Sequence, residues 1–176
     1  SGAGVDPETG MLYVPSSNAF SLRRYREPQP DEDATLAVIE GRGEFARRVT
    51  MPQGLPLFKP PYSRMTAIDL NTGDHLWMIA NGDTPDCVKN HPALRGLDIP
   101  RTGKPERSGI LVTKTLVFAG EGGGLFATPT WAGGPMFHAY DKLTGETLWE
   151  YELPKRQSGV PMTYMADGKQ YIAMAI

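Results

Sequence analysis

The two stretches that decide the fold are MTAIDLNTGDHLW, residues 65–77, and FHAYDKLTGETLW, residues 137–149. Both follow the frame Ala-x-Asp-x-x-Thr-Gly-x-x-Leu-Trp. In each stretch, apolar and polar residues alternate on both sides of a Thr-Gly pair, which is the pattern of a strand, a tight turn and a second strand. The repeated frame therefore predicts two β-hairpins of the same design, which we name the outer hairpins.

Three other stretches predict a second kind of hairpin, named here the inner hairpins. They are GVDPETGMLYVPSS from residue 4, SGILVTKTLVFAG from residue 108 and GVPMTYMADGKQYIAMA from residue 159. Each places turn-forming residues between two β-rich runs. The chain therefore alternates inner, outer, inner, outer, inner. Two hairpins make a four-stranded sheet, and a unit of this kind repeated about every 40 to 45 residues is typical of β-propeller blades.

The predicted fold class is all-β, a partial β-propeller of about two and a half four-stranded blades. We expect residues 1–176 to form a single propeller fragment, with one blade over 1–79, a second over 108–153 and a half blade over 159–176. The first blade carries an insertion over 18–64, which is either a lid or docking surface over the propeller, or an ordered excursion without function. With 20 Gly and 16 Pro placed between short β-rich runs, little helix is expected.

The residues of the repeated frame are predicted to be structural. Trp77 and Trp149 are expected to pack against the neighbouring blade, because a blade cannot bury both of its faces alone. Asp69 and Asp141 stand just before the turns, where a carboxylate can accept backbone N–H groups.

Composition restricts the function. The formal charge is -2, from 18 Lys and Arg against 20 Asp and Glu, so no basic surface for nucleic acid is expected. The single Cys87 excludes a disulfide within the chain and leaves the redox compartment open. The chain opens on SGAGVD without Met and stops within the apolar run KQYIAMAI. We interpret it as a fragment of a longer protein; the alternative is a small complete protein with a buried last strand.

The repeated frame resembles the tryptophan-docking motif of the quinoprotein dehydrogenases, which are eight-bladed propellers that hold pyrroloquinoline quinone (PQQ) and calcium. The segments VDPETGMLYVPSSN, PQGLPLFKPPYSRMTAIDLNTG, GILVTKTLVFAGEGG and GVPMTYMADGKQYIAMA are similar to the glucose and sugar dehydrogenase branch of that family. The resemblance covers nearly the whole chain. It implies that the chain corresponds to the last third of the propeller.

The resemblance also implies a function for the intact parent protein. It would oxidise a glucose-like aldose or an alcohol in the periplasm, with PQQ as electron acceptor, calcium polarising the quinone and an aspartate as general base. Electrons would pass to a membrane quinone or a separate carrier, and any membrane anchor would lie outside this chain. The alternative is a non-catalytic propeller that binds proteins, similar to outer-membrane assembly lipoproteins. Upstream residues would distinguish the two.

By the same resemblance, the family's catalytic aspartate, its quinone-contacting lysine and most calcium ligands lie upstream of this sequence. No catalytic and no metal-binding residue is therefore predicted here. The fragment alone is expected to be inactive and not to bind PQQ or calcium, and the rest of the parent propeller is its expected partner.

One contact of the family falls near the loop GKPERSGIL, residues 103–111, where several members place a tryptophan against the quinone ring. This chain has Arg107 and Ser108 there instead, and they are the predicted cofactor-binding residues. Arg107 could bind a quinone carboxylate by a charge-assisted hydrogen bond. The alternative is a solvated arginine.

Other motifs point to no further chemistry. GEGGG at 120–124 could cradle an anion, but no Gly-Lys-Ser/Thr follows, and a glycine-rich connection between strands is favoured. DTPDCVKNH at 83–91 could bind a metal or be a polar loop. His75 and His138 are expected to face solvent or a neighbouring strand, and neither has a nucleophile partner, which argues against a hydrolase. Trp131 could line a substrate funnel or cover a surface.

Overall fold

The structure is a computed structural model of the 176-residue chain. Its description covers every residue except 1, 19–23, 34–37, 41–49, 105–106 and 124–132. Within the described residues, no helix is long and apolar enough to cross a membrane.

Two four-stranded antiparallel sheets form the body of the molecule. The first has the strand order β1-β2-β5-β6 and the second has the order β10-β9-β8-β7, so each sheet joins one inner hairpin to one outer hairpin as the sequence predicts. The strands of the first sheet are β1 (Gly4–Asp6), β2 (Met11–Ser17), β5 (Ser63–Asp69) and β6 (His75–Ala80). Those of the second are β7 (Ile110–Val112), β8 (Leu116–Gly120), β9 (Met136–Asp141) and β10 (Thr147–Glu152).

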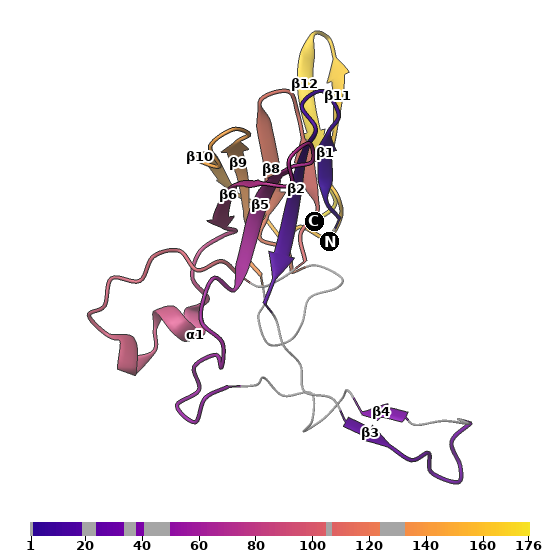
Figure 1. Cartoon of the computed structure of the whole chain (residues 1–176), viewed down its shortest axis with the longest axis vertical. Coiled ribbons are helices and arrows are strands. Elements are labelled where there is room, and N and C mark those ends of the chain that lie inside the picture. Colours follow the sequence, from indigo (N-terminus) through magenta and orange to yellow (C-terminus); the bar gives the residue numbers. More distant parts are fainter. Residues whose placement is uncertain (1, 19–23, 34–37, 41–49, 105–106, 124–132) are drawn as a thin grey trace.

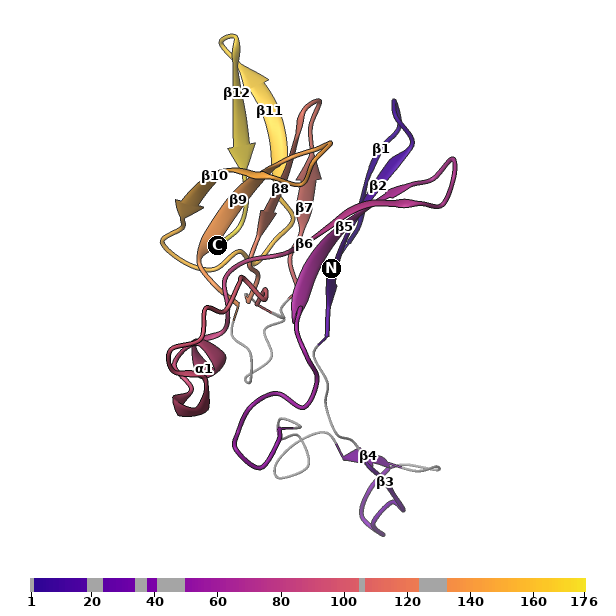
Figure 2. The ribbon, with the colours of Figure 1, turned by 60° about the vertical axis from the view of Figure 1, so that its left-hand side comes forward.

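The remaining elements are small. The hairpin of β11 (Met162–Ala166) and β12 (Lys169–Ala173) follows the second sheet. Figure 2 shows the two sheets and this hairpin as three successive layers. The insertion contains β3 (Arg24–Arg26) and β4 (Val38–Glu40), which pair with each other. Helix is limited to α1 (Asp86–Lys89) and the 3₁₀ turn η2 (Pro92–Leu94) among the described residues.

The two outer hairpins turn by the same local chemistry. The Asp69 carboxylate accepts the Asn71 N–H at 2.8 Å, and Asp141 accepts the N–H groups of Leu143 and Thr144 at 2.8 and 2.9 Å. The glycine of each Thr-Gly pair has a positive φ, 83° at Gly73 and 76° at Gly145, which glycine adopts without a steric cost. The predicted role of both aspartates is confirmed.

The core lies between the two four-stranded sheets. The first sheet contributes Met11, Tyr13, Met65 and Ala67, and the second contributes Ile110, Val117, Ala119 and Tyr140. Burying one large apolar side chain stabilises a fold by about 1.5 to 3 kcal/mol, so this cluster holds the two sheets together.

Trp77 packs between the two sheets, as predicted. Its indole N–H donates to the backbone carbonyl of Lys142 at 3.2 Å, and the Tyr13 hydroxyl donates to the same carbonyl at 3.2 Å. A Cβ placed on Gly145 would come within 2.8 Å of the indole ring, so the ring rests directly on the second turn.

The same expectation for Trp149 is wrong, because that side chain is 48% exposed. The residues facing Trp149 across its groove come from the β12 region, where Ile172 and Met174 lie, instead of from a complete four-stranded sheet. The two-stranded β11–β12 hairpin is too small to cover the Trp149 indole.

The two ends of the sheets differ. The tight turns of the inner and outer hairpins lie at one end of the sheets, named here the turn end (Figure 2). The long connections 18–62, 81–109 and 121–135 leave from the other end, named here the loop end. Figure 1 shows the described parts of the connections 18–62 and 81–109 below the sheets, and the β1–β2 and β11–β12 turns above.

Candidate functional site

The loop end carries a set of polar side chains that range from fully buried to exposed, which we name the loop-end cluster. They come from the connection between β6 and β7, from the end of β8, and from β9 and β10. The members are Asn81, Asp83, Arg101, Lys104, Glu121, His138, Tyr140 and Glu150.

Glu121 is at the centre of the loop-end cluster and its side chain is fully buried. It follows the last residue of β8, and its carboxylate accepts the Asp83 backbone N–H at 3.0 Å and the Lys104 ammonium at 3.0 Å. Burial alone raises the pKa of this carboxyl, but His138, the Asp83 amide and Lys104 outweigh the burial and leave the pKa below its ordinary value. Glu121 is therefore held as a charged carboxylate.

Two glycines make room for this carboxylate. A Cβ on Gly82, whose φ is 89°, would approach Oε1 of Glu121 to 2.6 Å. A Cβ on Gly134 would clash with Oε2 of Glu121 and would lie 2.7 Å from the Lys104 ammonium. Glycine at these two positions is required by close packing against a charged group.

His138 lies between two carboxylates. Its Nδ1 is 3.0 Å from Oε1 of Glu150, which is the residue paired with it across β9 and β10. An ionised carboxylate only accepts hydrogen bonds, so Nδ1 carries the proton. The Nε2 atom is buried, 3.8 Å from Oε1 of Glu121, and has no hydrogen-bond partner among the described residues. Of the two expected alternatives, solvent or a neighbouring strand, the contact with Glu150 on β10 confirms the second, and the closeness to Glu121 was not expected.

Glu150 connects the loop-end cluster to the surface. Its Oε2 accepts a hydrogen bond from Nη2 of Arg101 at 3.1 Å, and its Oε1 lies 2.8 Å from Nη1 of the same guanidinium. Arg101 lowers the pKa of the Glu150 carboxyl more than any other group. The pair is a bidentate ion pair, the geometry in which Arg and a carboxylate bind most specifically.

A second buried hydrogen-bond path joins the two sheets. The Tyr140 hydroxyl donates to Oδ1 of Asn81 at 3.0 Å, and the Asn81 amide donates to the Gly120 carbonyl at 3.1 Å. Burial raises the pKa of the Tyr140 hydroxyl, so it remains a donor. The path fixes the end of β6 against β8.

The predicted cofactor-binding residues lie just before β7. The Arg107 side chain is exposed, and Ser108 is buried with a hydroxyl that has no hydrogen-bond partner among the described residues. The next residue, Gly109, is fixed by the buried Gln157, whose Nε2 donates to the Gly109 carbonyl at 3.0 Å. Gln157 also accepts the Gly120 N–H at 3.0 Å.

The other motifs of the sequence have structural contacts. In the stretch 83–91, Asp83 pairs with Lys89 at 2.9 Å and His91 accepts the Ala93 N–H at the start of η2. No group of three or more His, Cys, Asp or Glu side chains in the described part of the chain is arranged to hold a metal. His75 is exposed. Trp131, Glu106 and Gly124 lie outside the described residues.

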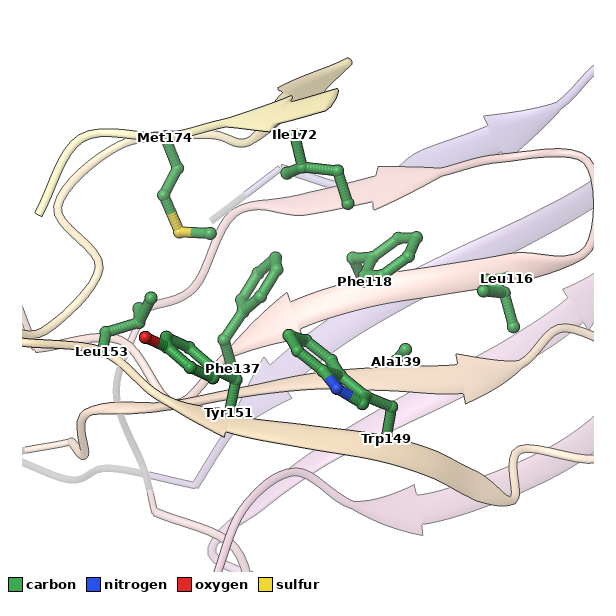
Figure 3. A pocket seen from close by; sticks show the side chains of 9 residues that line it. All are labelled: Leu116, Phe118, Phe137, Ala139, Trp149, Tyr151, Leu153, Ile172 and Met174. Atoms are coloured by element: carbon green, nitrogen blue, oxygen red, sulfur yellow. The ribbon is translucent and has the colours of Figure 1, made fainter. Parts of the chain in front are cut away.

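An apolar groove, shown in Figure 3, lies between the second sheet and the β12 region. Its volume is about 400 Å³, and Trp149, Phe137 and Phe118 face Ile172 and Met174 across it. The lining has no charged residue, so the groove is suited to apolar packing rather than to chemistry.

Reasoning from the sequence missed Glu121 and His138 as the centre of the site. Glu121 lies in the glycine-rich stretch GEGGG, which the sequence favoured as a connection between strands, and the stretch does connect β8 to β9. The glycines that admit its carboxylate, Gly82 and Gly134, lie outside that stretch. No local pattern marks Glu121, because the glycines and donors around its carboxylate come from other segments of the chain.

The fold and the loop-end cluster define the class of this protein. It is a segment of a β-propeller, with adjacent four-stranded sheets packed through their faces and polar groups gathered where the long connections leave. The solved structure of a europium-containing methanol dehydrogenase matches 98% of this chain, with a TM-score of 0.56 and 23% identity, and the chain covers 23% of it. At that identity the likeness concerns the fold.

The sequence then identifies the family. Residues 1–172 match the family described as PQQ, the glucose/ethanol/alcohol dehydrogenase β-propeller domain, and the chain belongs to this family. It is 34% identical over 128 residues to a probable quinate dehydrogenase (quinone) of Xanthomonas campestris pv. juglandis, covering 69% of this chain and 14% of that protein. It is 32% identical over 130 residues to the quinoprotein glucose dehydrogenase of Gluconobacter oxydans (strain 621H), covering 73% and 15%. The chain thus spans about a seventh of these relatives.

Proposed function

We propose that this chain is the C-terminal part of the propeller of a PQQ-dependent dehydrogenase that oxidises a glucose-like aldose or an alcohol. The family match over residues 1–172 is the observation that carries the proposal. Relatives are named for quinate, glucose, glycerol and alcohol, so the proposed substrates are polyhydroxylated or simple alcohols. The proposed compartment is the periplasm, and the proposed electron acceptors are a membrane quinone or a separate carrier.

The donors before β7 fit the acidic groups of the quinone. Ser108 supplies a buried hydroxyl without a partner in the described structure, and the adjacent Arg107 supplies a guanidinium. Both groups donate hydrogen bonds to carboxylates. We propose that they bind and orient the quinone, which accepts two electrons from the substrate when it is bound. We assign the proposed calcium to residues of the parent outside this chain, as the resemblance implies.

The apolar groove supports a further part of the proposal. Trp77 is covered by the turn of the next sheet, whereas Trp149 is exposed beside the groove. We propose that the rest of the parent propeller covers this surface, and that the repeated frame acts there as the tryptophan-docking motif.

The test is a dye-linked dehydrogenase assay on the intact parent, loaded with PQQ and calcium and supplied with aldoses, alcohols and quinate. Quinone-dependent dye reduction with at least one of these substrates is the expected result. A folded, quinone-loaded parent that oxidises none of them would overturn the proposal and favour a propeller that binds proteins.

A further inference from the structure

Five members of the loop-end cluster form a closed circuit of contacts. Lys104 contacts Glu121, Glu121 lies beside His138, His138 contacts Glu150, and Glu150 contacts Arg101. Arg101 and Lys104 belong to the same connection, whereas Glu121 directly follows β8, and His138 and Glu150 lie on β9 and β10. The circuit therefore holds residues 101–104 against the sheet at two points.

The segment that follows is also fixed at its far end. Gln157 binds the Gly109 carbonyl, the Gly159 carbonyl and the Gly120 N–H at 3.0, 2.7 and 3.0 Å. Lys104 and Gly109, which come before and after Arg107 and Ser108 in the sequence, are thus each held by side chains of other segments.

Stability alone does not account for this circuit. Desolvating a carboxylate is costly, and well-packed apolar residues in place of a whole buried ion pair are often neutral or stabilising. Glu121 is fully buried, and Gly82 and Gly134 are required to admit it. What the charged group supplies is a single geometry, because its two oxygens specify where the Asp83 amide and the Lys104 ammonium must lie.

We propose that Glu121 is a positioning residue: through Lys104 and His138 it fixes the connection that leads to Arg107 and Ser108, and so sets the affinity for the quinone. The inference rests on the proposed function, because it takes Arg107 and Ser108 as quinone contacts. Glu121 acts through its neighbours and does not touch the quinone itself.

The first measurement is hydrogen–deuterium exchange of the intact parent without quinone. In Glu121→Gln, the amide has one acceptor oxygen, so its NH₂ group faces one of the two donors, Asp83 N–H or Lys104. Peptides covering residues 101–110 should then exchange at least roughly tenfold faster than in the wild type. The control is Glu152→Gln, an exposed residue on β10 two positions from Glu150, which should exchange as the wild type does.

The second measurement is a quinone titration of the same apo proteins, with kcat measured at saturating quinone. Loss of a residue that orients ligand contacts typically weakens binding 10- to 100-fold, so Glu121→Gln should raise the quinone Kd by about that factor while kcat changes less than about threefold. A loss of folded protein would lower the active fraction and leave the Kd unchanged, so the Kd distinguishes positioning from stability.

Arg101→Gln provides a second variant that is expected to fold, because the Arg101 side chain is 49% exposed. It opens the circuit at its outer end and should raise both the exchange rate and the Kd by a smaller factor. A wild type that fails to bind quinone would refute the proposed function. A wild type that binds, with Glu121→Gln and Arg101→Gln matching its Kd and exchange, would refute the positioning role.

Discussion

At the scale of single residues, the two tryptophans of the repeated frame have different surroundings. Trp77 is half-buried and donates to the Lys142 carbonyl, whereas Trp149 is 48% exposed. Identical sequence contexts therefore do not give identical contributions to stability, because the contribution depends on what covers the ring.

Trp77→Ala should destabilise the 176-residue chain by roughly 3 kcal/mol, since it removes packing between the sheets and a hydrogen bond. Trp149→Ala should cost about 1 kcal/mol or less, as expected for a half-exposed side chain. Urea denaturation midpoints of the two variants provide the measurement. Equal losses would contradict the packing assigned to Trp77.

The two turn glycines form a matched pair for a second test. Both have a positive φ, so replacement by alanine costs about 1 kcal/mol at either position. Only Gly145 faces a ring, because a Cβ there would lie 2.8 Å from Trp77, whereas nothing lies within 4 Å of a Cβ on Gly73. Gly145→Ala should therefore lower the free energy of unfolding by about 1 to 3 kcal/mol more than Gly73→Ala does. Chemical denaturation measures the difference, and similar losses would disprove the contact.

At the scale of elements, a buried ion pair joins the turns of the two sheets. Asp6 ends β1, Lys142 lies in the β9–β10 turn, and Nζ of Lys142 is 2.6 Å from Oδ2 of Asp6. The hydrogen bond from Lys142 is the largest cause that lowers the pKa of the Asp6 carboxyl to about 2, and the Thr9 hydroxyl adds to it. The pair fixes the angle between neighbouring sheets at the turn end.

This ion pair should make the free energy of unfolding depend on pH in the acidic range. The carboxyl pKa is lower in the folded chain than its unfolded value of about 3.9, so the stabilisation is fully present above that value and is lost as the pH falls through about 2. The difference in denaturation midpoint between wild type and Asp6→Asn should therefore shrink between about pH 5 and pH 2. The control is Asp98→Asn at an exposed position. If the difference in midpoint between wild type and Asp6→Asn did not change with pH, the role of the pair would be contradicted.

At the scale of the whole molecule, the proposed function assigns this chain one side of a functional site. The chain contains the loop-end cluster and the donors before β7. No residue of this chain is assigned as the general base or as a metal ligand, which the resemblance to the family places upstream. Electrostatic stabilisation of a transition state requires donors fixed around the developing charge in an enclosed site.

The 176-residue chain alone should therefore show no dehydrogenase activity with PQQ and calcium. The dye-linked assay that is used for the parent is the measurement, with the parent as the positive control. Turnover by the chain alone would show that the active site lies within it, against the placement proposed here.

The sequence by itself determined the hairpins, their turns and the order of strands within each sheet. These features depend on neighbours a few residues apart, such as the Asp69 carboxylate and the Asn71 N–H, so the local pattern contains them. The repeat of the frame then indicated the propeller class. Arg107 and Ser108 were predicted from a resemblance, and their role stays a prediction.

Only the tertiary structure decided which tryptophan is covered and which polar groups form the site. The hydrogen bond from Tyr140 to Asn81 joins residues 59 positions apart, and the pair of Lys142 with Asp6 joins residues 136 positions apart. No periodicity of the sequence specifies such partners, because they are set by how separate sheets pack. For the same reason Glu121 looked like part of a glycine-rich loop until the fold placed Lys104, His138 and the Asp83 amide around its carboxylate.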